Sequence, residues 1–322
     1  MTATTETLTE SPNGTLTLSP EASLNRLPVT AYQTTQTARD WVCAHTLHQL
    51  IREHYSAPAP SVRQFLQDFQ PGHTLSDRIL AEYGNRLAAV LRTALRADHW
   101  HRGSPWQQAY AEFWRNTRTL VLSGGISTGD FGNCLAERLE IDLGYLTVLA
   151  SPWGGQTGLV GLAQHVSSAE DLLVMDFGAT GIKSAIASRH GNRLDPFSDI
   201  QVKDWLDSEG LFRQPALLEL LSQLRQQIGQ PLPVAISIAT YLNQGHPFDY
   251  RSGIYHRLRD DCPHLATTLN ENWLPQCGLG PLALLEHDST AAALAFRFSE
   301  PAIMVTLGTG LGVGICPIAK PA

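Results

Sequence analysis

The sequence lacks the features that would place the protein in a membrane, on nucleic acid or around a structural metal. No apolar run approaches the roughly 20 residues that a membrane-spanning helix needs, and the N-terminus has no basic segment followed by an apolar one. The net charge of −7 at pH 7 argues against binding to nucleic acid or to an anionic membrane. The 5 cysteines are scattered and form no Cys-x-x-Cys pair, so reduced thiols, a cytoplasmic location and no structural zinc are expected.

Three common catalytic motifs are also absent. A dinucleotide fingerprint, G-x-G-x-x-G, fails after Gly308 because its third glycine would fall on Val313. A P-loop needs a glycine directly before its lysine, and here Ile182 precedes Lys183. The G-x-S-x-G turn of a serine hydrolase does not occur. What remains is a set of glycine-rich and threonine-rich turns that fit none of these patterns.

Apolar strand-like runs alternate with helical patterns, which predicts an α/β fold. The length of 322 residues suits two lobes or one large α/β domain. Strands are predicted at 15–18, 119–122, 146–149, 172–175, 185–187, 234–238, 282–285 and 303–307. Helices are predicted at 38–54, 62–69, 74–97, 133–139, 215–228 and 291–298. Residues 1–14 are expected to form a flexible tail.

The stretch Asp176–Lys183 has the pattern of a strand, a glycine-rich turn and a second strand, with a carboxylate at the end of the first strand. Main-chain N–H groups in such a turn form a cavity for anions. An aspartate beside that cavity would oppose a bare phosphate, so the arrangement makes sense if Mg²⁺ lies between them. The alternative is an ordinary β-hairpin with a polar corner.

Three further turns follow predicted strands. The turn at Gly308, Thr309 and Gly310 could grip a polyphosphate together with Gly178 and Thr180. The turn at Gly124-Gly125 would let something flat lie close to the backbone. Asp288 stands at a strand end and a helix start, where it could take a proton from a substrate hydroxyl, or alternatively cap the helix.

Together these turns resemble the motifs of sugar kinases with the actin/hexokinase-type ATPase fold, most closely the ROK family (repressors, open reading frames and kinases). Asp176–Lys183 resembles the first phosphate motif, D-x-G-x-T-x-x-K, and Thr306–Ile315 resembles the second. Glu286–Ala293 is similar to the N-D-x-x-A-A-A segment that holds the catalytic base. Leu122–Ser127 resembles the adenosine motif, and Gly158–Ala163 the small-residue turn that normally comes last.

The resemblance implies a two-lobed α/β fold of the actin/hexokinase-like (ribonuclease H-like) class and an ATP- and Mg²⁺-dependent kinase. It makes Asp288 the catalytic base and Asp176 the partner of Mg²⁺. The substrate is expected in a cleft between lobes, near Asn243, His246 and His287. The residues assigned to the nucleotide are Asp176, Gly178, Thr180, Lys183, Gly308, Thr309, Gly310, Gly124 and Gly125.

The order of the motifs departs from the family, in which the first phosphate motif comes first and the adenosine motif last. A circular permutation explains the difference, with residues 172–322 followed by 1–166 as the usual order. One lobe would then comprise residues 15–166 and 300–322, and the other residues 167–299. The alternative is an exchange of half-chains in a homodimer.

Two further departures concern the acceptor. The family's zinc-binding cysteine cluster is absent, and its sugar-gripping E-x-G-H segment is degenerate at Glu21–Arg26. His287 replaces the usual asparagine beside the base. The expected partner is a small sugar-like molecule, with neither nucleic acid nor a membrane. A sugar or nucleotide sensor with weak catalysis, or an ATPase coupled to another protein, stays open as an alternative.

Overall fold

The computed structural model describes residues 17–31, 34–166, 170–191 and 193–319. The described chain divides into two compact units, and each is considered by itself. Unit 1 includes residues 21–157 and 296–319, and unit 2 includes residues 17–20 and 158–295. The tail predicted at 1–14 lies outside the described residues, and the predicted lobe boundaries at 166/167 and 299/300 stay predictions.

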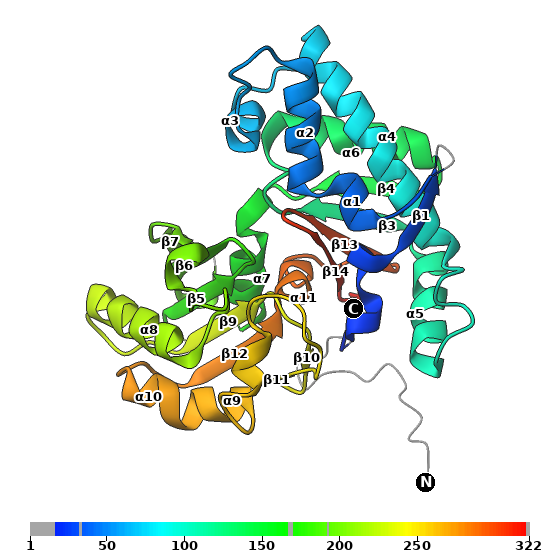
Figure 1. Cartoon of the computed structure of the whole chain (residues 1–322). Coiled ribbons are helices and arrows are strands. Elements are labelled where there is room, and N and C mark those ends of the chain that lie inside the picture. Colours follow the sequence, from blue (N-terminus) through cyan, green and yellow to red (C-terminus); the bar gives the residue numbers. More distant parts are fainter. Residues whose placement is uncertain (1–16, 32–33, 167–169, 192, 320–322) are drawn as a thin grey trace. The chain divides into compact units, whose positions relative to one another are not determined.

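Unit 2 is built on a 6-stranded mixed sheet with the order β12-β9-β5-β6-β7, in which β8 also pairs with β6 (Figure 1). The hairpin β5–β6 is antiparallel, whereas β9 and β12 run parallel to β5. The strands are β5 (Leu172–Phe177), β6 (Gly181–Ala187), β7 (Leu194–Pro196), β8 (Ile200–Gln201), β9 (Val234–Ile238) and β12 (Leu282–His287).

Helices cover both faces of this sheet, because successive residues of β5 enter two different cores. Leu172 and Val174 pack with α7 (Thr157–His165), while Leu173 and Met175 pack with α8 (Gln214–Ile228). A strand buried on both faces reads as a continuous apolar run, which is why 172–175 and 234–238 were predictable. The other helices of this unit are α9 (Leu265–Thr268), α10 (Leu274–Gln276) and α11 (Asp288–Ala293).

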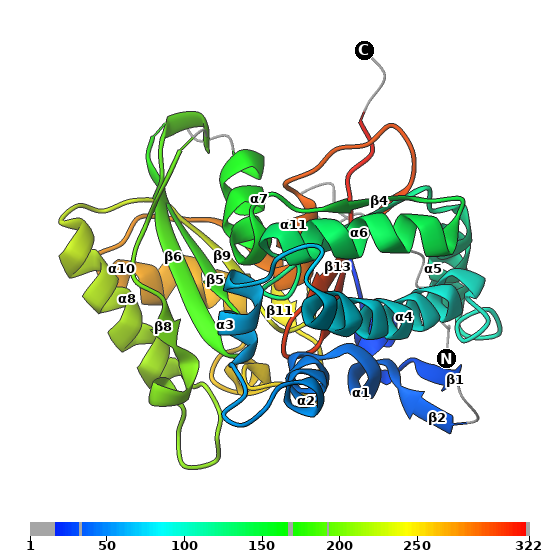
Figure 2. The same cartoon turned by 90° about the horizontal axis from the view of Figure 1, so that it is seen from above.

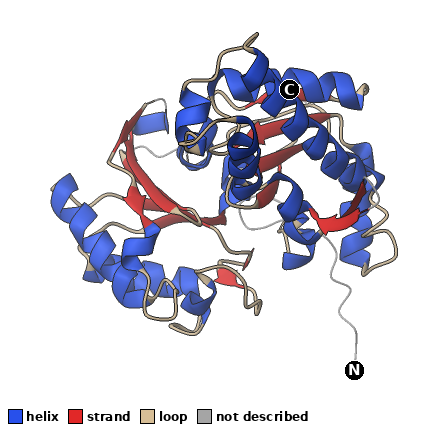
Figure 3. Ribbon diagram, turned by 45° about the horizontal axis from the view of Figure 1, so that its top comes forward, coloured by secondary structure: helices blue, strands red, loops and turns tan. Residues whose placement is uncertain are grey.

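Unit 1 contains a 4-stranded sheet with the order β14-β13-β3-β4. Its hairpin β13–β14 is antiparallel, and β3 and β4 run parallel to β13. These strands are β3 (Thr119–Ser123), β4 (Thr147–Ala150), β13 (Ala302–Leu307) and β14 (Leu311–Ile315), drawn in red in Figure 3. The hairpin and its two parallel strands repeat the arrangement of unit 2, but here the parallel strands precede the hairpin in the chain.

The remaining elements of unit 1 are mainly helical (Figure 2). The longest helix, α4, buries an apolar stripe that includes Ile79, Tyr83 and Leu87. The elements are β1 (Pro28–Ala31), β2 (Thr34–Thr37), α1 (Ala38–Val42), α2 (Ala44–His54), α3 (Val62–Gln67), α4 (Thr74–Arg96), α5 (Pro105–Asn116) and α6 (Gly129–Leu143). Among the described residues, no helix combines the length and apolar character that crossing a membrane requires.

The structure corrects several predicted elements. The helix predicted at 38–54 is broken at Cys43, whose ψ of 171° is extended. The helix predicted at 291–298 is α11, which starts at Asp288 and ends at Ala293. Of the strand predicted at 15–18, residues 17 and 18 have no regular structure and the other two lie outside the described residues.

Helix α5 was not predicted, although its start carries a recognisable signal. Pro105 occupies its first turn, and Ser104 and Gln107 form a capping box. The same capping pattern therefore could have located it.

Candidate functional site

The turn between β5 and β6 presents two adjacent backbone donors. Phe177 and Ile182 form the last strand pair, and Gly178 N–H donates to Gly181 O over 3.1 Å. The N–H groups of Ala179 and Thr180 have no hydrogen-bond partner within the described part of the chain, and both residues are exposed. Consecutive free N–H groups of this kind bind anions, so the geometry suits the predicted phosphate role.

Asp176 lies near the end of β5, immediately before this turn. Its Oδ1 accepts a hydrogen bond from Ser237 Oγ at 2.7 Å, and Lys183 stands opposite it on β6. Burial raises the pKa of the Asp176 carboxyl, the Lys183 ammonium and the Ser237 bond lower it, and Asp288 raises it. A cation beside Asp176 would therefore offset an unfavourable buried charge.

The donor set around Asp176 limits how Mg²⁺ could be held. The described residues contain no group of three His, Cys, Asp or Glu side chains that could hold a metal. Mg²⁺ usually keeps several waters and binds through one or two carboxylates and substrate phosphates. Asp176 alone fits that mode, with water and phosphate supplying the other ligands.

Asp288 is the first residue of α11, and its carboxylate is held on one side. Its Oδ1 accepts from Ser289 N at 2.6 Å and from Ser289 Oγ at 3.0 Å, and lies 3.2 Å from His287 Nε2. Its Oδ2 accepts no hydrogen bond from any described residue. The N-cap of α11 is His287, so Asp288 does not cap the helix, and contact between its Oδ2 and a substrate hydroxyl stays a prediction.

His287 is buried, with 6% of its surface exposed, and its Nε2 faces Asp288 Oδ1. Its ring stacks on Tyr241 with centroids 4.5 Å apart, and its Nδ1 lies 3.4 Å from Thr290 Oγ1. Burial lowers the pKa of His287 and the Asp288 carboxylate raises it, with burial the larger effect. A neutral ring can accept from Thr290 and donate from Nε2 to Asp288; contact between His287 and a substrate stays a prediction.

Tyr255 is a site residue that the sequence did not reveal. It is fully buried, its hydroxyl donates to Gly178 O over 2.8 Å, and burial raises its pKa well above the usual value. The charges of Asp176 and Asp288 raise that pKa further, so both carboxylates lie within electrostatic range of one phenol. Tyr255 follows an irregular loop without periodicity. Ser237, in contrast, could have been noticed as the one polar residue in an apolar strand.

Asn243 and His246 lie on the small hairpin of β10 (Leu242–Asn243) and β11 (His246–Pro247). His246 Nδ1 accepts the backbone N–H of Leu265 over 3.1 Å, so this ring nitrogen holds the start of α9. Burial lowers the pKa of His246. No interaction within the described chain joins Asn243 or His246 to Asp288, and their contact with a substrate stays a prediction.

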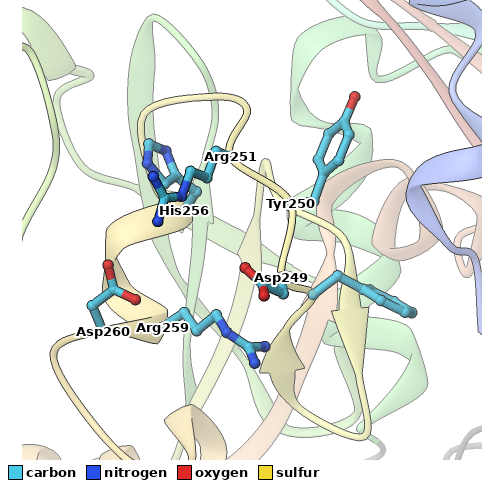
Figure 4. A pocket seen from close by; sticks show the side chains of 7 residues that line it. Asp249, Tyr250, Arg251, His256, Arg259 and Asp260 are labelled. Carbon is cyan, nitrogen blue, oxygen red and sulfur yellow. The ribbon is translucent and has the colours of Figure 1, made fainter.

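A hollow that is open to solvent lies in the loop after β11 (Figure 4). Arg259 donates to Pro247 O over 2.7 Å, and Asp260 is paired with Arg257 at 2.6 Å. The lining residues are Phe248, Asp249, Tyr250, Arg251, His256, Arg259 and Asp260. Because cations and carboxylates are mixed and partly committed to each other, the hollow is not a simple anion site.

In unit 1, the turn between β13 and β14 resembles the first turn in its hydrogen bonding. Gly308 N–H donates to Gly310 O over 3.0 Å. The N–H groups of Thr309 and Gly310 have no hydrogen-bond partner among the described residues, and Thr309 is exposed. The second predicted phosphate turn therefore also presents two adjacent backbone donors.

Gly124 and Gly125 have different structural roles. Gly124 has a φ of +95°, and a Cβ there would approach the backbone N of Leu307 to 2.9 Å. A Cβ on Gly125 would meet nothing within 4 Å. Gly124 is thus required by the close crossing with the end of β13, whereas Gly125 has the open space that a ligand needs.

Comparisons with known proteins find only distant structural likeness. The sequence matches no family model, and no curated protein matches it. The structure resembles Lmo2764 of Listeria monocytogenes, a proposed N-acetylmannosamine kinase, with 18% identity, TM-score 0.34 and coverage of 46% of this chain and 47% of that one. It also resembles the Aquifex aeolicus Ppx/GppA phosphatase, with 11% identity, TM-score 0.30 and coverage of 47% and 50%. The chain thus spans about half the length of these structures.

Because these TM-scores are low, the description of the fold rests on the strand order of the sheets. Each unit joins an antiparallel hairpin to two strands that run parallel to the first strand of the hairpin. The α/β class, predicted from the alternation of strands and helices, is confirmed. The actin/hexokinase-like architecture and the permuted order stay predictions.

Gly124 and Gly125 provide a matched pair of substitutions. We expect Gly124→Ala to lower the free energy of unfolding by about 1–3 kcal/mol. The φ of residue 124 is left-handed, and the added Cβ would clash with the backbone of Leu307. Gly125→Ala should leave stability nearly unchanged. Urea unfolding of both variants checks this; equal stability of the two would contradict the assigned crossing.

The lowered pKa of His287 predicts a pH dependence of stability. An unfolded histidine titrates near about pH 6.5, whereas the folded state resists protonation, so this contribution is complete above that pH and is lost as pH falls. Between pH 7.5 and 5.5, His287→Asn should lose less stability than the wild type, by up to about 1.4 kcal/mol per pH unit. Urea unfolding at both pH values measures the difference. Exposed His99→Asn is the control, and parallel losses in all three proteins would contradict the prediction.

Proposed function

We propose that the protein is an ATP- and Mg²⁺-dependent phosphotransferase that acts on a hydroxyl of a small sugar or sugar derivative. One observation carries the proposal: Asp176 and Asp288 lie at the same edge of the sheet in unit 2. β5, β9 and β12 are parallel neighbours, so Asp176, Ser237 and Asp288 come together at their carboxyl ends. Ligands of open α/β sheets bind at that edge.

Asp288 is the residue that receives the proton. The substrate oxygen attacks the γ-phosphorus of ATP, the bond from that phosphorus to the β–γ bridging oxygen breaks, and ADP leaves. The hydroxyl proton passes to Asp288 Oδ2, while Oδ1 stays fixed by Ser289 and His287. Because little covalent chemistry is left for the protein in phosphoryl transfer, orientation of the hydroxyl is the main task of this carboxylate.

The nucleotide phosphates are assigned to the two turns with free N–H groups. In unit 2 these groups belong to Ala179 and Thr180, and in unit 1 to Thr309 and Gly310. Asp176 would hold Mg²⁺ through water; when bound, the ion would neutralise charge on the transferred phosphate. Gly125 is assigned to adenosine because it has open space.

The acceptor is proposed to be sugar-like, with Asn243 and His246 as candidate contacts. Neither is joined to Asp288 by a described interaction, so the sugar class rests on the resemblance of the motifs. A cytoplasmic, homodimeric enzyme with no nucleic-acid or membrane partner is likewise a proposal.

A second candidate is a sugar- or nucleotide-binding sensor with weak catalysis. Its support is the crowding of donors on Asp288: Ser289 N–H, Ser289 Oγ and His287 Nε2 all meet one oxygen. Three donors on one oxygen hold the carboxylate in a fixed orientation, which suits a structural role at the start of α11. Sugar-dependent formation of ADP supports the kinase, and nucleotide binding without turnover supports the sensor.

We also propose that the chain is a circular permutation of the family order. In unit 2, the hairpin β5–β6 comes before the parallel strands β9 and β12 in the sequence. In unit 1, the parallel strands β3 and β4 come before the hairpin β13–β14. Moving residues 172–322 in front of residues 1–166 gives both units the same order along the chain.

Asp288→Asn tests the kinase proposal. The amide keeps the size of the side chain but cannot accept the proton, so we expect transfer to fall by about 10²–10⁴-fold. The affinity of this variant for a fluorescent ATP analogue should equal that of the wild type within experimental error. ADP release over a panel of sugars and amino sugars measures transfer, and exposed Asp204→Asn is the matched control. Normal turnover in Asp288→Asn would contradict the assignment of Asp288 as the catalytic base.

A reordered gene tests the permutation. A chain of residues 172–322 followed by 1–166 keeps every native strand contact, so we expect cooperative unfolding and nucleotide affinity close to those of the native order. The control is a chain opened within β9, which should fail to fold because a central strand is cut. Failure of the first chain to fold, with soluble expression of the control, would contradict the proposal.

A further inference from the structure

The turn between β13 and β14 is held by a side chain from the other end of the sequence. Asn25, in the short 3₁₀ turn Leu24–Arg26, accepts the N–H of Leu311 on its Oδ1 at 2.8 Å. Its Nδ2 donates to the carbonyl of Leu311, also at 2.8 Å. Opposed residues in antiparallel strands exchange the same two bonds. One amide therefore substitutes for a strand residue beside β14.

Among the described residues, no further strand pairs with the sheet beside this contact. β14 is the outermost strand in the order β14-β13-β3-β4, and Leu311 is its first residue. Leu24 and Leu27, on either side of Asn25, are fully buried, so the 3₁₀ turn is anchored in the core of unit 1. An anchored amide fixes the point at which the turn ends and the strand begins.

Asn25 also packs against the turn itself. A Cβ on Gly310 would lie 2.7 Å from Asn25 Oδ1, and the φ of Gly310 is not left-handed. Glycine is therefore needed at 310 because Asn25 is close, and not because of the backbone conformation. At the other end of the turn, Gly308 O accepts the N–H of Ala44 over 2.8 Å.

Both ends of the turn are thus fixed, and the free N–H groups of Thr309 and Gly310 lie between them. Resting on the proposed function, we infer that Asn25 is a positioning residue for the polyphosphate of a nucleoside triphosphate. It does not contact the phosphates. It holds the two donors in the orientation that binds them, so that less ordering is needed when the nucleotide arrives.

Two substitutions separate this role from general stability. Asn25→Asp keeps an acceptor for Leu311 N–H but loses the donor to Leu311 O, and Asn25→Ala loses both bonds without adding charge. In each variant we expect the Kd of a non-hydrolysable ATP analogue to rise about tenfold, which corresponds to ~1.4 kcal/mol. The Kd of adenosine, which has no phosphate, should not change. The KM for ATP should rise in step, with kcat at saturating ATP nearly unaltered.

Asn133→Asp is the matched control, because Asn133 is an exposed asparagine on α6 of the same unit. Hydrogen exchange of the Leu311 amide provides an independent readout, and it should accelerate in Asn25→Ala only. If the Asn25 variants lost affinity for ATP and adenosine in parallel, or bound both as the control does, the role of Asn25 would be overturned. The proposed function would not be affected by either result. A wild-type protein that binds no ATP analogue would overturn the proposed function and the inference together.

Discussion

The parallel pairing of β5, β9 and β12 is the constraint on which the candidate site depends. Parallel neighbours end at the same edge of a sheet, so this pairing alone brings together Asp176, Ser237 and Asp288 from three distant parts of the sequence. A slip of one residue in β5 would turn Asp176 to the other face. The two cores that receive alternate residues of β5 prevent such a slip. Packing of the apolar residues along β5 thereby fixes the relative positions of the carboxylates.

The sheet of unit 1 repeats the strand arrangement of the sheet in unit 2, but different residues lie beside its hairpin turn. Its hairpin turn also has two backbone N–H groups without a partner among the described residues, but the turn contains no carboxylate. Two glycines of this unit are needed because other groups pack closely against them. Gly124 crosses the end of β13, and Gly310 accommodates Asn25. Glycine at these two positions is therefore explained by close neighbours within unit 1.

The sequence predicted the features that depend on local pattern. The buried strands were recognisable as apolar runs, and the turns after them as clusters of glycine and threonine, which gave the α/β class and the candidates Asp176 and Asp288. Features that depend on distant contacts were not predictable. The pairing of Asn25 with Leu311, the bond from Tyr255 to Gly178 and the stacking of His287 on Tyr241 join residues with no shared periodicity. The break at Cys43 was missed because its flanking segments share one helical pattern.

The order of strands has a consequence for how the chain folds during synthesis. Unit 2 is almost contiguous, with its sheet formed entirely between residues 172 and 287. The sheet of unit 1 needs β3 and β4 from early in the chain and β13 and β14 from near its end. Because synthesis proceeds from the N-terminus, the first-made helices and strands of unit 1 must wait for their partners while the whole of unit 2 emerges. The half of the protein that is made first is thus completed last.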